Sequence, residues 1–424
     1  METLLGAGVV GIAGLLTGSG AWPFKLMRKY QFEHWWLIAM LIALIIIPWS
    51  ITLFACPDPI EGLRAVPLRT LIKANLFAAG WGIANVLCGL CFVRIGMALT
   101  GAILAGLGVC VGTIVPLVFK GTGLFKDAPD LDSPAGMAVL AGVGVMLIGV
   151  LFATFAGFGR DRQLTSLQAD NKKGSAQSGS FLGGLIMTAV AGVLSAGLSL
   201  AFVYSQGPII ANLCLVQPNT EIKVRVNAEG QDELARKLSR TYSVSAEGTM
   251  EVEGVGTIAV GGQKAVHAAE RIRERLASAV PGGQREVGVD TGAILAVFGV
   301  WAAGLFAGSA LNVAYALYLL TRNKSWHVFG ESWKDAGLAV IMGVTSIIAV
   351  GLQGKGMLML GALGASIGFG IQQAMQMTGS QGVGFISGEW RGVKGKPRYQ
   401  MYVAIGVLIV AAIIMAYGNT LAKS

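Results

Sequence analysis

Side chains able to hydrogen-bond or stack on a small polar molecule recur inside apolar segments of this sequence. Trp81 and Asn85 stand four residues apart, so on a helix they share one face. An aromatic face against C–H groups and an amide against hydroxyls are contacts that suit a small hydroxylated molecule. The alternative is that Asn85 bonds a neighbouring helix while Trp81 packs, and the sequence weighs the two equally.

Other amides and hydroxyls have comparable spacing. Ser195 and Ser199 also share a helix face, although a serine in such a helix often bonds its own backbone, which favours packing for this pair. Polar side chains deep in a membrane are costly without partners, which favours positions that line a watery cavity. The remaining candidates for binding a polar substrate are Asn312, Tyr315, Gln372, Gln373 and Gln376.

Lys355 is the candidate for exchanging a proton. The apolar stretch 334–388 must hold two spans, and a turn near 361–366 balances them and places Gln353 and Lys355 inside the first. Burial lowers the pKa of a lysine, so such a residue could take part in proton coupling. In the alternative register, Lys355 lies in a short outer turn and reaches the membrane surface.

Motifs of enzyme chemistry are missing from the sequence. The three histidines, His34, His267 and His327, are expected outside the spans and are far apart along the chain. Neither an HExxH pattern nor a GxxxxGK[ST] loop occurs. We therefore expect no enzyme, no cofactor and no metal site.

The composition predicts the elements that carry these residues. Hydrophobic residues make up 54% of the 424 residues and charged residues 13%, whereas a soluble domain carries about 25% charged residues. A span needs about 20 mostly apolar residues, and in hydrocarbon such runs form helices. The fold class expected is an all-α polytopic membrane protein with about ten transmembrane helices at 4–22, 35–55, 70–92, 97–119, 135–157, 181–205, 292–320, 334–360, 364–387 and 400–418.

The basic residues predict an orientation. Cytoplasmic loops carry an excess of Lys and Arg, so the charges after the first run place the N-terminus outside. Carried through ten spans, this leaves seven basic residues on the outer side, apart from 217–290. The cytoplasmic side then holds fifteen: Lys25, Arg28, Lys29, Arg94, Arg160, Arg162, Lys172, Lys173, Arg322, Lys324, Lys334, Arg391, Lys394, Lys396 and Arg398.

The segment 217–290 has a different composition from the rest. Apolar residues alternate with charged ones from Ile222 to Val226, a strand pattern. "DELARKLSR" and "QKAVHAAERIRERLASAV" predict helices, and "TMEVEGVGTIAV" predicts one or two strands. We expect a small α+β insert outside the membrane, on the periplasmic side, between a first part at 1–214 and a second at 291–424. Its role as a spacer or lid is favoured over ligand binding.

A short internal repeat suggests how the helices are organised. "AGLLTGSG" at 13–20 resembles "AGVLSAGL" at 191–198. Five spans followed by five spans place the two halves in opposite orientations. Two inverted repeats with a substrate site between them are common in secondary transporters.

Several longer stretches carry a resemblance to a known family. They are "AWPFKLMRKYQFEHWWLI" (21–38), "IIPWSI" (46–51), "WGIANVLCGLCFVRIGMALTGAI" (81–103), "AGVLSAGLSLAF" (191–202) and "GEWRG" (388–392). Through them the chain resembles the L-rhamnose–proton symporter family of the drug/metabolite transporter superfamily. The resemblance implies a ten-helix carrier of a deoxy-hexose with a proton. No Asp or Glu lies in the interior of the ten runs, which makes Lys355 the near-midplane candidate for the proton.

The expectation is a secondary transporter of L-rhamnose or a related monosaccharide in a bacterial inner membrane. Its partners would be the sugar, protons and the lipid bilayer, without nucleic acid, and a homodimer is left open. One alternative is a membrane-anchored sensor or assembly protein whose insert binds a ligand or partner. Another is a carrier of an unrelated solute, since a fold does not determine a substrate.

Overall fold

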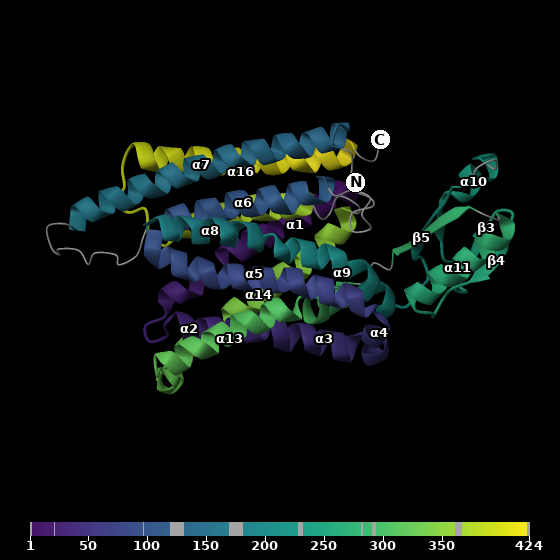
Figure 1. The fold of residues 1–424 in the computed structure, drawn as a ribbon, viewed down its shortest axis with the longest axis horizontal. Helices are drawn as coiled ribbons and strands as arrows, with labels where there is room; N and C mark the ends of the chain where they lie inside the picture. The colour runs from purple at the N-terminus through teal and green to yellow at the C-terminus, as the bar shows by residue number, and fades with distance from the viewer. Residues whose placement is uncertain are drawn as a thin grey trace. The chain divides into compact units, whose positions relative to one another are not determined.

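The computed structural model describes residues 2–20, 22–95, 97–118, 131–168, 181–227, 232–280, 283–290, 294–360 and 367–421. Helices predominate, as Figure 1 shows. Helices are the expected solution for apolar runs, because lipid cannot hydrogen-bond the backbone and a helix satisfies these groups internally.

The helices of the first half follow the predicted runs. They are α1 (Glu2–Ser19), α2 (Phe32–Met40) with the π-helical turn η2 (Leu41–Ile46) and α3 (Ile47–Ala55), α5 (Leu68–Ile95), α6 (Met97–Val118), α7 (Pro134–Gln168), α8 (Phe181–Ser195) and α9 (Gly197–Leu213). The short helices η1 (Trp22–Leu26) and α4 (Pro59–Ala65) connect them.

The last part of the chain is helical in the same way. Its elements are α12 (Ile294–Gly299), η3 (Val300–Gly304), α13 (Phe306–Arg322), η4 (Trp326–Gly330), α14 (Trp333–Leu360), α15 (Phe369–Ile386) and α16 (Lys396–Leu421).

Seven helical segments in the described residues are long and apolar enough to cross a membrane. An eighth is added if Ile294–Gly304 and Phe306–Arg322, which are broken at Leu305, count as one span. The other two apolar runs are occupied by α6 and α15, which are helical but do not meet the same criterion. The chain is thus a polytopic membrane protein.

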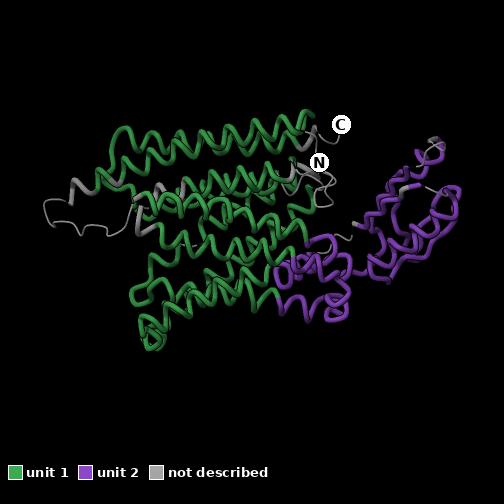
Figure 2. Tube along the Cα trace, in the orientation of Figure 1, with its two compact units in different colours: residues 1–48, 73–204, 305–424 green, residues 49–72, 205–304 purple. Residues whose placement is uncertain are grey.

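The chain divides into two compact units, coloured separately in Figure 2. One comprises 1–48, 73–204 and 305–424, and the other 49–72 and 205–304. Within the first unit, α7 lies along α16, and α1 packs against both α14 and α15.

The insert, in the second unit, is an α+β domain. An antiparallel sheet has the order β2-β1-β5, and β3 pairs with β4 in a hairpin. The elements are β1 (Glu221–Asn227), α10 (Asp232–Leu238), β2 (Thr241–Ser243), β3 (Thr249–Val252), β4 (Gly256–Ala259), α11 (Ala265–Ala279) and β5 (Gln284–Asp290). The predicted strand at 222–226 and both predicted helices are confirmed, and the segment predicted to hold one or two strands holds two, β3 and β4.

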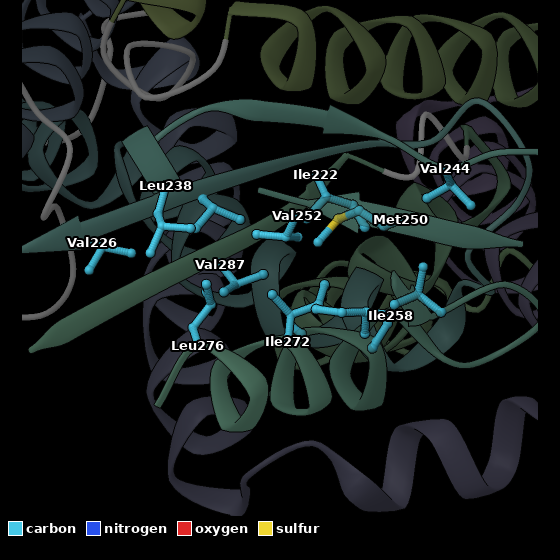
Figure 3. Close-up of a cluster of buried hydrophobic side chains, with 14 of the residues drawn as sticks. Ile222, Val226, Leu238, Val244, Met250, Val252, Ile258, Ile272, Leu276 and Val287 are labelled. Carbon is cyan, nitrogen blue, oxygen red and sulfur yellow. The ribbon is translucent and has the colours of Figure 1, made fainter. Parts of the chain in front are cut away.

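The core of the insert explains this agreement. In β1, buried and exposed residues alternate strictly, as the apolar pattern predicted. Figure 3 shows side chains of β1, the hairpin and α11 gathered in one cluster, with Ile272 and Leu276 from the helix. Ala265 and Ala268 complete the buried face of α11, and Val266 between them is half-buried.

Two expectations about span boundaries need correction. The second span begins at Phe32, so Glu33 and His34 lie in its first turn rather than outside it. The backbone N–H of Gln31 donates to His34 Nδ1, and this cap starts the helix before the purely apolar run. The outer-turn alternative for Lys355 is also wrong, because α14 continues to Leu360. The predicted turn at 361–366 lies outside the described residues.

Candidate functional site

Helices α5 and α13 approach closely at glycines. A Cβ atom on Gly82 would lie 2.9 Å from Leu311 Cβ and 3.0 Å from the carbonyl oxygen of Gly308. A Cβ on Gly308 would lie 2.8 Å from Cε3 of Trp81. Neither position tolerates a larger residue without a shift of the backbone. Small residues at such crossings allow the polar groups of two membrane helices to meet.

Two asparagines on α5 bond α13 on either side of this crossing. Asn75 Oδ1 accepts from the backbone N–H of Ala307 at 2.8 Å, which satisfies a free donor in the first turn of α13. Asn85 Nδ2 donates to Asn312 Oδ1 at 3.1 Å. Asn312 also donates to the carbonyl oxygen of Gly308 at 2.8 Å, so its orientation is fixed.

This arrangement leaves hydrogen-bonding capacity for a ligand. Asn312 is buried, whereas Asn85 and Trp81 are half-buried. No hydrogen bond among the described residues uses the amide oxygen of Asn85. An acceptor beside an aromatic ring, near the middle of two helices, suits a hydroxylated molecule. Tyr315, one turn after Asn312 on α13, is half-buried as well.

The predicted serines have different surroundings. Ser195 Oγ donates to the carbonyl oxygen of Gly192 at 2.7 Å and lies against Gly108 of α6. These contacts fit the packing interpretation. Ser199 is buried on α9, one turn beyond the helix break at Ala196.

The predicted glutamines form a second polar group, at the crossing of α1 and α15. Gln372 Nε2 donates to Gln376 Oε1 at 2.9 Å. Gln372 is buried, and its Oε1 has no hydrogen-bond partner in the described structure. A buried amide oxygen without a donor is unfavourable, so it is available to a bound hydroxyl or water. Gln373 is half-buried on the adjacent face.

The proposed coupling residues lie on α14. Gln353 is buried and Lys355 is half-buried, with the next residue, Gly356, packed against Val10 of α1. The predicted candidates therefore fall into separate groups: the asparagine pair with Trp81, the glutamine pair, and these two side chains. In the described residues no hydrogen bond joins the asparagine pair to the glutamine pair.

Buried ionisable residues missed by the sequence analysis lie at the ends of spans. Asp335 Oδ2 accepts from the backbone N–H groups of Arg28, Lys29 and Tyr30 at 3.0, 2.7 and 3.0 Å. Burial, reinforced by the charge of Asp335, raises the pKa of Tyr30 above its usual value. Glu33 and His34 are buried on α2. In the sequence, the three-residue spacing of Gln31 and His34 is typical of a helix cap, and only this pattern could have placed Glu33 and His34 inside the helix.

An ionic cluster links connecting segments of the first unit. Glu389 forms ion pairs with Lys25 and, at 3.2 Å, with Arg160. The Arg160 guanidinium also lies 5.5 Å from the ring centre of Trp390, which is buried. The "GEWRG" stretch at 388–392, which carries part of the family resemblance, thus connects the segment after α1 to the end of α7.

These helices, with amides meeting between them, define a polytopic membrane protein with polar groups inside its bundle. Residues 6–213 match the family model described as L-rhamnose-proton symport protein (RhaT). That stretch runs from α1 to the end of α9, so it contains Trp81 and Asn85 but not Asn312.

Individual relatives agree with this match. The chain is 32% identical over 182 residues to an L-rhamnose-proton symporter of Yersinia pestis bv. Antiqua (strain Antiqua), covering 42% of this chain and 49% of the relative. The identity is also 32% over 182 residues to the L-rhamnose-proton symporter of Yersinia pseudotuberculosis serotype O:1b (strain IP 31758), with 48% of that relative covered. The chain thus matches about half the length of these curated relatives. No solved structure matches it.

Proposed function

We propose that this protein is a secondary transporter that carries L-rhamnose, or a closely related monosaccharide, together with a proton. The observation that carries the proposal is the Asn85–Asn312 pair, which places a free amide oxygen beside Trp81 between two closely packed helices. The similarity of residues 6–213 to L-rhamnose-proton symport proteins supports the substrate class. A transporter, rather than an enzyme, is also what this similarity favours.

The proposed architecture has ten spans in two inverted five-helix repeats, within the drug/metabolite transporter superfamily. Counting α6 and α15 as spans gives this number, because each occupies one of the ten apolar runs. Alternating access would then expose the site to either side of a bacterial inner membrane. The termini and 217–290 would lie on the periplasmic side, in agreement with the distribution of basic residues.

The proposed sugar contacts come from two polar groups. Trp81, Asn85, Asn312 and Tyr315 form the first, on α5 and α13. Gln372 supplies an unbonded acceptor to the second, with Gln373 and Gln376. Ser199 on α9 stays a further candidate, whereas the hydroxyl of Ser195 already bonds its own helix. Lys355, with Gln353, is the first candidate for proton coupling.

Uptake of labelled L-rhamnose into proteoliposomes, with and without an inward proton gradient, tests this function. The variant Asn85→Ala removes the free acceptor, and losing one hydrogen bond to the sugar should lower uptake at low substrate by about 3- to 10-fold. Thr321→Ala is the matched control, because Thr321 is an exposed residue of α13 whose hydroxyl bonds only its own helix. Normal uptake by Asn85→Ala would remove this residue from the site.

The insert favours a second candidate function. Residues 217–290 have a hydrophobic core of their own, which a simple connecting loop would not need. A sensor or assembly protein would use this domain to bind a ligand or partner, with the helices as an anchor. Deleting 217–290 separates the transporter from the sensor or assembly protein, because uptake that survives the deletion would make the domain accessory to transport.

The remaining alternative is a carrier of an unrelated solute. If the complete chain transports no L-rhamnose, a screen of other solutes tests it.

A further inference from the structure

His34 is fully buried in the first turn of α2, and both of its ring nitrogens have partners. Nδ1 lies 3.2 Å from the backbone nitrogen of Gln31 and accepts its hydrogen. Nε2 lies 2.9 Å from the carbonyl oxygen of Ser325. A carbonyl accepts only, so Nε2 must carry the hydrogen, and Nδ1 must carry none. In this arrangement the imidazole is therefore neutral.

The neighbouring Glu33 holds the same segment. Its Oε1 accepts from Asn323 Nδ2 at 2.9 Å and from Ser325 Oγ at 3.1 Å. Two adjacent residues of α2 thus fasten the stretch directly after α13 by three hydrogen bonds. We call this set, His34, Glu33, Asn323 and Ser325, the α2–α13 clasp.

The clasp is rigidly connected to the asparagine pair. Asn312 and Asn323 are three turns apart along α13, or about 16 Å at 1.5 Å per residue. Leu37 of α2 packs against Ala316 and Leu320 of α13 between these points. A movement that opens the clasp would therefore displace the helix that carries Asn312.

The groups around His34 are mostly aromatic. The rings of Tyr30 and Phe329 have their centres 5.4 and 5.1 Å from the imidazole. The charged groups are Glu33 beside it and Asp335, which bonds the backbone N–H of Tyr30. Farther from the ring, Glu331 lies between η4 and α14 and pairs with Lys29 and His327 at 3.4 and 3.7 Å.

We infer that His34 binds the transported proton and that its protonation opens the α2–α13 clasp. A proton arriving from solvent would bind at Nδ1, where the new N–H would point at the N–H of Gln31. That clash, and the loss of a hydrogen bond, disfavour the clasped state. When the segment after α13 moves away, the ring reaches water and the Glu33 carboxylate stabilises its positive charge. The proton leaves from Nδ1 when the clasp forms again.

This inference rests on the proposed transport function and changes one assignment in it. A proton that binds one of two conformations more tightly shifts the population toward that conformation. His34 satisfies this requirement through its geometry, because the clasped arrangement leaves no place for a hydrogen on Nδ1. Lys355 would then be a structural or substrate-facing residue.

The variant His34→Gln tests the assignment in proteoliposomes. A glutamine can accept from Gln31 and donate to Ser325 as the neutral ring does, but it cannot take up a proton. We expect the stimulation of L-rhamnose uptake by an inward proton gradient to fall to about 1-fold, while gradient-independent counterflow of the sugar changes by less than about twofold. His327→Gln, at an exposed histidine of η4, should keep the stimulation. Stimulation that persists in His34→Gln would overturn the inference.

Hydrogen exchange separates this inference from the transport function. In the wild-type chain, exchange at 323–330, corrected for the intrinsic rate, should accelerate about 10-fold between pH 8 and pH 5.5. The exchange rate at 323–330 should not depend on pH in His34→Gln, and it should increase from pH 8 to pH 5.5 in His327→Gln. If exchange at 323–330 in the wild-type chain does not depend on pH, protonation does not open the clasp, and the inference is rejected without a variant. If the chain takes up no L-rhamnose but its exchange depends on pH, the proposed substrate is rejected, whereas the opening of the clasp by protonation stands.

Discussion

The insert and the membrane helices bury their interiors in opposite ways. In the insert, large aliphatic side chains such as Ile222, Ile272 and Leu276 are fully buried, and charged residues cover the surface. In the helices of the first unit, close crossings occur at glycines, and large residues such as Leu4 and Leu182 stay about 60% exposed, while others such as Phe369 are buried. Large apolar residues therefore form the core of the insert but lie on both the inside and the outside of the helix bundle.

The solvent of each region accounts for the difference. Water drives apolar surface together, so the insert buries its largest apolar residues. Lipid tails are as apolar as leucine, so membrane helices gain little by hiding such residues from lipid. Close packing and hydrogen bonds remain as the attraction, and both require small residues at the crossing. The contact of α5 with α13, through Gly82, Gly308 and the asparagine pair, is of this kind.

Gly18→Val gives the strongest test of packing by small residues, at the crossing of α1 with α15. A Cβ at this position meets the carbonyl group of Gln376, and backbone cannot rotate aside as a side chain can. We expect loss of the folded protein, read as the monodisperse fraction in detergent after size exclusion. Gly8→Val on the same helix is the control, since a Cβ there meets nothing within 4 Å. Equal recovery of the two variants would contradict small-residue packing as the basis of this bundle.

Ile272→Ala, in the insert, should have a smaller effect than Gly18→Val, although still a large one. This fully buried side chain lies in the core shown in Figure 3, and such truncations cost about 2–5 kcal/mol because they lose transfer energy and leave a cavity. Hydrogen-exchange protection of β1 and β5 in the complete chain should fall accordingly. Arg273→Ala, at an exposed site of the same helix, should leave it unchanged. Unchanged protection in Ile272→Ala would mean that the insert is not stabilised by its core.

Prediction from sequence succeeded where the signal was local. The strand at 222–226 was visible because its buried side alternates with charges, and α11 because its apolar residues recur at helical spacing. The apolar runs likewise become helices throughout the described residues. Glu33 and His34 were missed because a run judged by hydropathy starts at the first apolar residues, whereas the cap at Gln31 starts the helix earlier.

The candidate site depended on contacts that no local pattern encodes. Asn85 and Asn312 are 227 residues apart, and only the glycines at the crossing let their amides meet. The sequence could identify both as polar residues in apolar runs, but not as partners. Asn75 was overlooked for the same reason, since its role depends on the break before α13. Pairing across the bundle is a property of the packed helices.

The smallest expected effect is at the surface of the insert, where Arg240 and Glu253 form an ion pair at 3.5 Å. Both side chains are more than half exposed, at 59% and 67%, so water and salt screen their attraction. Glu253→Gln should therefore change the stability of the insert by less than about 1 kcal/mol, measured as the exchange protection of β3 and β4 in the complete chain. A loss comparable to that of Ile272→Ala would show that charge as well as core packing holds this domain together. The contrast between the two regions would then rest on more than the burial of large residues.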